Sequence, residues 1–196
     1  MKTISLILSL FLAITIHAQN GSAKSNKNKT DRFSYSLDGL GPESIVVDVS
    51  GLKKSAMAAK AEEWVEEKYG DKKGLNREED ESDKGGKREK LRLEEFTDNA
   101  ICFGTGADYG CTGLTYIVRL VFEDEEYEFI PTKITYKPEG SKKTVKINFN
   151  KSDFHANNGA LNSGFENVPS QIEDLLNNLN KSLYFYLIDE EQKTEW

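Results

Sequence analysis

Residues 113–137 read GLTYIVRLVFEDEEYEFIPTKITYK, and this stretch decides the fold. From Leu114 to Phe122 every second residue is apolar, which is the pattern of a β-strand with one buried face. The acidic run from Asp124 to Glu126 interrupts the alternation, and the pattern resumes at Tyr127. The stretch therefore predicts a long β-hairpin.

The second strand of this hairpin changes phase along its length. Its first apolar residues, Tyr127 and Phe129, have odd numbers, whereas Ile134 and Tyr136 have even numbers. One extra residue has to be accommodated between the two pairs. Proline has no N–H to donate to a ladder and lies between them, so we expect a β-bulge at 130–132.

Two amphipathic patterns predict helices on either side of the strand-rich region. The first covers 53–69, with Trp64 on its apolar face, and the second covers 170–188. We expect Trp64 to lie in the core, because a large ring on the apolar stripe docks a helix on a sheet. Further short strands are predicted at 45–49, 91–96, 101–103 and 145–149, with a turn at Asp98-Asn99 between the middle two.

These elements predict one α+β domain over residues 33–188. We expect a single antiparallel sheet of about five to six strands, with the two helices on one face, in the order β-α-β-β-β-β-β-α. Most of residues 71–90 are charged, with both signs mixed, and the stretch is interpreted as a mobile insertion. Residues 189–196 form a polar C-terminal tail.

The N-terminus has the form of a secretory signal peptide. Lys2 precedes an apolar run, and Ala18 is a plausible cleavage point, so we expect residues 1–18 to be removed and 19–32 to form a disordered leader. The net charge is −7, and loss of Lys2 would make it −8. Such a chain repels nucleic acid and anionic membranes. No later apolar run has the length of a membrane span. A soluble periplasmic or secreted protein is predicted.

Cys102 and Cys111 are the two cysteines. An even pair in an exported chain indicates a disulfide. A zinc site would need more Cys or His ligands, and a thiol nucleophile would need a base, for which only His155 remains after residue 18. We interpret His155 as an exposed loop residue. No catalytic, cofactor-binding or metal-ligating residue is predicted.

Three kinds of function remain open. The face of the sheet opposite the helices would present Ile117, Arg119, Val121 and Lys133, which could receive a protein or peptide, although an ordinary solvated face has the same composition. The acids from Glu123 to Glu128 could instead serve a carboxylate-dependent hydrolase acting on glycans, although such a run is usually solvated. A small-ligand carrier would need an apolar cavity between the sheet and the helices. The oligomeric state stays open.

The order of these motifs resembles a large family of uncharacterised secreted bacterial proteins with a TATA-binding-protein-like fold. The resemblance rests on Ile45–Gly51 followed by Leu52, Trp64–Tyr69, Tyr116–Pro131 with Thr135-Tyr136, and Leu176–Leu187. The chain departs from the family at the charged stretch 71–90 and at Asp124-Glu125-Glu126, where the family often has a basic, glycine-containing turn. The resemblance implies the fold and export, and it implies no activity.

Overall fold

The computed structural model describes residues 32–78 and 88–188. The predicted signal peptide (1–18), all but the last residue of the predicted leader (19–32), the middle of the charged stretch (79–87) and the predicted tail (189–196) lie outside the described residues. None of the described helices is long and apolar enough to span a membrane.

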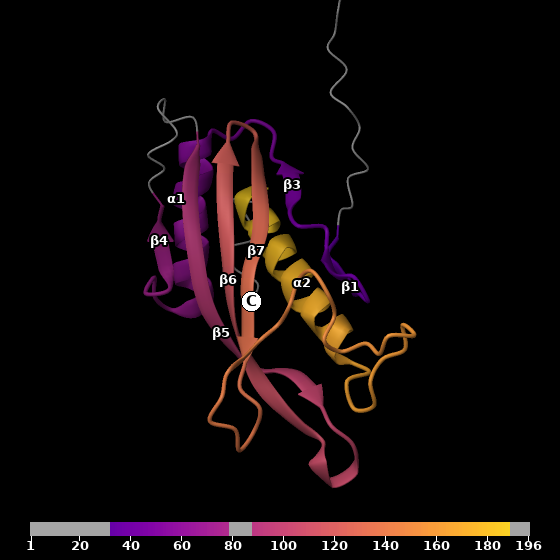
Figure 1. Cartoon of the computed structure of the whole chain (residues 1–196). Helices are drawn as coiled ribbons and strands as arrows, with labels where there is room; N and C mark the ends of the chain where they lie inside the picture. The colour runs from indigo at the N-terminus through magenta and orange to yellow at the C-terminus, as the bar shows by residue number, and fades with distance from the viewer. Residues whose placement is uncertain (1–31, 79–87, 189–196) are drawn as a thin grey trace, which may run out of the picture.

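The architecture is a six-stranded antiparallel sheet with two helices, as Figure 1 shows. The sheet runs in the order β3 (Ile45–Asp48), β7 (Glu126–Tyr136), β6 (Gly110–Glu123), β5 (Glu89–Phe103) and β4 (Leu75–Arg77), and β8 (Val145–Lys146) pairs with β7. The helices are α1 (Lys54–Tyr69) and α2 (Val168–Ile188). A small hairpin of β1 (Ser34–Ser36) and β2 (Gly39–Gly41), and a 3₁₀ turn at Gly106–Asp108, complete the fold.

Both helices pack on the same face of the sheet, behind it in the view of Figure 1. The predicted α+β class is therefore confirmed. The alternating residues of β6 that begin at Leu114 are buried against the helices, and Trp64 is 3% exposed on α1, as expected. Burial of this apolar surface supplies the main driving force for folding.

The predicted β-bulge in the second hairpin strand is confirmed. Ile117 pairs with Lys133 and Val118 pairs with Pro131, so Thr132 is the extra residue. The bulge restores the inward direction of Ile134 and Tyr136, which allows both strands to keep one apolar face.

The prediction of two strands with a turn at Asp98-Asn99 is wrong. Residues 89–103 form the single strand β5. Thr97 pairs with Leu114 and Ile101 pairs with Thr112, so residues 98–100 bulge out of the ladder. Asn99 has a φ of 50°, a left-handed conformation that asparagine adopts more readily than most residues. A bulge of this kind has the same local signal as a turn.

The interpretation of 71–90 as a mobile insertion is wrong at both of its ends. Residues 75–77 form β4 at the edge of the sheet, and β5 begins at Glu89. The Arg77 guanidinium forms ion pairs with Glu62 of α1 at 2.6 Å and with Glu89 at 3.2 Å. The charge of Arg77 therefore joins the edge strand β4 to α1 and to β5.

Candidate functional site

The face of the sheet opposite the helices, here called the open face, carries the four residues predicted to bind a partner. Ile117, Arg119 and Val121 lie on β6 and Lys133 lies on β7. Ile117 is 9% exposed and Val121 is 7% exposed, although both lie outside the core formed with the helices. Long charged side chains on neighbouring strands can cover such residues with their aliphatic stems.

Ion pairs lie on the open face and at the end of the face where β6 ends. Arg119 Nε lies 2.7 Å from Glu78 Oε2, Arg92 Nη2 lies 2.6 Å from Glu94 Oε2, and Arg88 Nε lies 2.6 Å from Glu123 Oε1. Lys133, by contrast, is exposed and forms no ion pair within the described residues. The face therefore presents two shielded aliphatic residues, a set of paired charges, and Lys133 as a cation that is available to a partner.

Phe96 adds an exposed aromatic ring to the open face. Its side chain is 58% exposed and rests on Gly113 of β6, where an added Cβ would lie 2.2 Å from Phe96 Cζ. Glycine at position 113 thus allows the ring to lie against the neighbouring strand. The predicted turn at 98–99, which is wrong, prevented the assignment of Phe96 to the open face.

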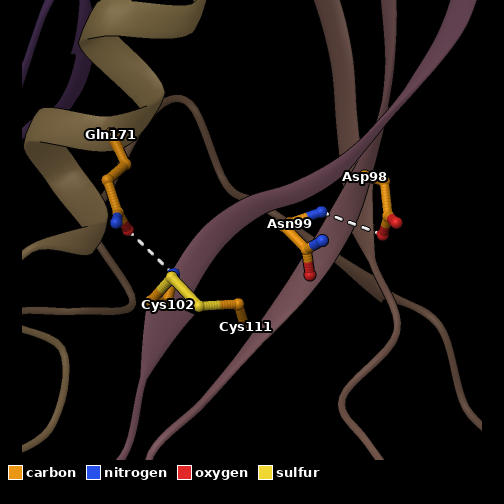
Figure 2. The surroundings of a disulfide bond; sticks show 5 residues. All are labelled: Asp98, Asn99, Cys102, Cys111 and Gln171. Atoms are coloured by element: carbon orange, nitrogen blue, oxygen red, sulfur yellow. Dashed lines mark hydrogen bonds between the residues drawn. A yellow bond between two sulfur atoms is a disulfide. The ribbon is translucent and has the colours of Figure 1, made fainter.

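The predicted disulfide between Cys102 and Cys111 is present, with a Cα–Cα distance of 4.0 Å (Figure 2). The two cysteines are directly opposite each other on β5 and β6, just beyond the bulge at Asp98 and Asn99. Gln171 of α2 accepts a hydrogen bond from the Cys102 backbone N–H at 2.9 Å. The disulfide therefore joins β5 and β6 next to the loop that connects them. Gln171 links this end of the hairpin to α2.

A groove of about 770 Å³ lies between the edge strand β3 and helix α2. One wall is formed by the four residues of β3, together with Tyr127 of β7. The other wall is polar and comes mostly from α2. It is lined by Arg32, Asn177, Asn178, Asn180, Lys181 and Tyr184. No local pattern predicts this groove, because the residues of β3 and of α2 that line it are more than 120 positions apart in the chain.

A second groove, of about 260 Å³, lies between the two helices. It is lined by Trp64, Glu67, Lys68, Ser182 and Tyr186. Trp64 Nε1–H donates a hydrogen bond to Ser182 Oγ at 3.1 Å, so the indole joins the two helices. This contact gives Trp64 a packing role.

Asp124, at the hairpin tip, is engaged in structural contacts. Asp124 accepts hydrogen bonds from the Lys54 backbone N–H at 3.2 Å and from Lys53 Nζ at 3.3 Å, at the N-terminus of α1. These bonds, led by the backbone one, lower the pKa of Asp124. The side chain therefore stabilises the start of a helix whose own preceding residue provides no cap.

The two grooves do not support the hydrolase or the carrier hypothesis. Asp48 is the carboxylate in the lining of the first groove, and Glu67 is the carboxylate in the lining of the second. A glycosidase mechanism needs two carboxyl groups on either side of one bond. Within the described residues, no cluster of three or more potential ligands could hold a metal ion. Both grooves open at the surface and have partly polar linings, which is unlike the interior of an apolar carrier.

A buried hydroxyl pair lies between α1 and the sheet. The oxygens of Tyr69 and Tyr116 are 2.6 Å apart. Burial raises the pKa of both hydroxyls, and it also raises the pKa of the nearby Glu95, with a smaller contribution from Asp71. Neither tyrosine lines either of the two grooves. The pair is therefore a structural contact of the core.

His155 makes a contact that the sequence did not indicate. Its Nδ1 lies 2.6 Å from Ser152 Oγ, and the serine hydroxyl also accepts a hydrogen bond from the Phe154 backbone N–H at 3.1 Å. Ser152 is 3% exposed, and neither residue lines one of the two grooves. The pair therefore holds the turn before the loop bridge between His155 and Leu161.

Two solved structures resemble this chain. A DUF4468 family protein from Bacteroides ovatus has a TM-score of 0.50 at 13% identity, over 76% of this chain and 87% of that one. A TBP-like protein from Parabacteroides distasonis has a TM-score of 0.41 at 20% identity, over 78% and 92%. No family model and no curated protein matches the chain. The likeness to the DUF4468 family protein, at 13% identity, supports the predicted α+β fold.

Proposed function

We propose that this protein is an exported, non-catalytic binding domain that receives a protein partner on the open face. One observation carries the proposal: both helices cover the same side of the sheet, and no described element covers the other side (Figure 1). The β-strands hold the side chains of the open face in a rigid array, which lowers the entropic cost of binding.

The chemistry of the open face suits a protein partner. Its centre contains Ile117 and Val121, which are 9% and 7% exposed, and Phe96 exposes a ring at one end. Around them lie Arg119 and Lys133. Protein interfaces combine an apolar and aromatic centre with a polar rim, and aromatic residues and arginine are enriched in them.

Export is the second part of the proposal. The predicted signal peptide (1–18) would direct the chain out of the cytoplasm, and a disulfide between Cys102 and Cys111 suits the oxidising compartment that it would reach. The partner would then be a periplasmic, cell-surface or secreted protein.

Charge reversal on the open face tests the binding role. We expect Arg119→Glu and Lys133→Glu to abolish or strongly reduce crosslinking of the purified protein to a partner in envelope extract. Lys142→Glu is the matched control, because Lys142 is exposed in the loop between β7 and β8. Identical crosslinked products from all three variants would argue against the open face. Ile117→Asp is less suitable, because a charge at a position 9% exposed would also disturb the fold.

A further inference from the structure

The edge strand β3 presents backbone groups to the groove that it forms with α2. Among the described residues, β3 pairs with β7 alone. The Val49 N–H donates to the Glu125 carbonyl at 2.7 Å, which sets the phase of the ladder. Hydrogen-bonded residues alternate along an antiparallel strand, so the N–H and C=O of Val47 face β7 and those of Val46 face outward. Val46 also lines the groove.

On the opposite wall, tertiary hydrogen bonds hold two of the asparagines in place. Asn177 accepts a bond from the Phe33 N–H at 2.8 Å and donates one to the Phe33 carbonyl at 2.9 Å. Asn180 Oδ1 accepts a bond from the Tyr127 hydroxyl at 2.8 Å. Asparagine is a weak helix former, so three asparagines within four positions of a long helix are costly to the helix itself. A polar wall of this kind suits a ligand with peptide groups.

The charges of the groove favour an acidic ligand. Arg32 and Lys181 both line it, and neither forms an ion pair within the described residues. Lys181 Nζ lies 5.6 Å from the centre of the Phe185 ring. The one acid in the lining, Asp48, already has an interaction partner. Two available cations in a chain of net charge −7 form a local site for carboxylates.

We propose that this groove binds an extended peptide segment with acidic side chains, which adds to β3 as a further strand of the sheet. The outward N–H and C=O of Val46 pair with the peptide backbone, and Arg32 and Lys181 bind its carboxylates. Edge-strand addition of this type derives affinity from main-chain hydrogen bonds and specificity from alternate side chains. The site is separate from the open face and does not depend on it.

The test uses a displayed library of random heptapeptides, selected on the purified protein. We expect enrichment of peptides with Asp or Glu at alternate positions. Binding of a selected peptide should weaken about tenfold in Val46→Pro and about tenfold in Lys181→Glu, because each change removes a main-chain or a charge-assisted hydrogen bond. Lys142→Glu, the same charge change outside the groove, should bind like the wild type.

Val46→Pro is designed to keep the fold, because the N–H that it removes lies outside the β3–β7 ladder. Its urea midpoint is measured beside the binding, and Lys181→Glu gives an independent answer on a helix surface. The proposal is overturned if no peptide is enriched, if selected peptides lack acidic residues, or if Lys181→Glu leaves binding unchanged. A wild-type dimer in sedimentation that Lys181→Glu dissociates would also overturn it, since a second copy would then occupy the groove.

Discussion

The hydroxyl oxygens of Tyr69 and Tyr116 are 2.6 Å apart, which joins the last residue of α1 to the central strand β6. Tyr116 is 1% exposed, so this hydrogen bond is made away from bulk water. Burial raises the pKa of both groups, and both are therefore neutral at physiological pH. The pair fixes the C-terminal end of α1 on the sheet.

Removing one hydroxyl of this pair should destabilise the fold. Tyr116→Phe leaves the Tyr69 hydroxyl without its partner, and an unsatisfied buried group costs about 1–3 kcal/mol. The free energy of unfolding, measured in urea, should fall by about this amount. The double variant Tyr69→Phe with Tyr116→Phe should lose less than the sum of the single changes, because it leaves no orphaned hydroxyl. Strictly additive losses would contradict the coupling.

The disulfide should contribute measurably to stability. Closing a short loop between Cys102 and Cys111 is expected to be worth about 2–3 kcal/mol in the chain-entropy description. The double variant Cys102→Ser with Cys111→Ser should therefore have a lower urea midpoint than the wild type. A reducing agent should lower the wild-type midpoint to a similar value and leave the double variant unchanged. A wild-type midpoint that ignores the reducing agent would refute this contribution.

Gly113 should tolerate no side chain. An alanine Cβ at this position would lie 2.2 Å from Phe96 Cζ and 2.9 Å from the Thr97 carbonyl oxygen, so the ring and the strand would both have to move. Overpacking of this kind costs about 1–3 kcal/mol. Gly110→Ala, on the same strand, is the control, because its nearest atom would be Glu139 Oε2 at 3.5 Å. Equal urea midpoints for the two variants would contradict the contact.

Alkaline pH should unfold the protein through its buried tyrosines. Burial raises the pKa of Tyr35 from 10.0 to about 12, and burial also raises the pKa of Tyr127. Below pH 10 these hydroxyls are neutral in both states, so stability is unaffected. Between pH 10 and pH 12 the unfolded chain ionises more readily, and the free energy of unfolding should fall.

Urea unfolding at several pH values checks this dependence. We expect Tyr35→Phe to show a smaller loss of stability between pH 10 and pH 12 than the wild type, because one of the groups that ionise on unfolding is gone. Identical pH profiles for the two proteins would show that Tyr35 ionises equally well in both states.

Cleavage of the predicted signal peptide is tested by the mass of the exported protein. We expect a mature N-terminus at Gln19, because Ala18 ends the apolar segment and its small side chain suits signal peptidase. Intact mass spectrometry of protein recovered outside the cytoplasm gives the answer. A chain that retains residues 1–18 would contradict processing, and material found only in the cytoplasm would contradict export.

The central hairpin can be predicted from the sequence because its signals are local. The alternation from Leu114 onward and the phase change around Pro131 predicted the two strands and the bulge, which the pairing confirms. The core position of Trp64 is predictable for a similar reason, since helical periodicity and side-chain size are both local properties of the sequence.

The errors come from features that local patterns cannot separate. A bulge at Asn99 and a turn have the same composition, so the local pattern predicts two strands where the structure has one. The edge strand β4 lies in a charged stretch, and the ion pairs of Arg77 that support it involve residues from α1 and β5.

The groove beside β3 cannot be predicted without knowledge of the fold. The asparagines of α2 gave a weak signal, since they are unusual in a helix interior, but their position beside β3 comes from tertiary packing.

Site-specific photocrosslinking tests the central claim most directly. A photoreactive amino acid is placed at Lys133 on the open face, and at the exposed Glu63 on α1 as the control. In cells that export the protein, we predict a discrete crosslinked protein from position 133 and none from position 63. A partner captured from position 63 alone would contradict the account, because the docking surface would then lie on the helices and not on the uncovered side of the sheet.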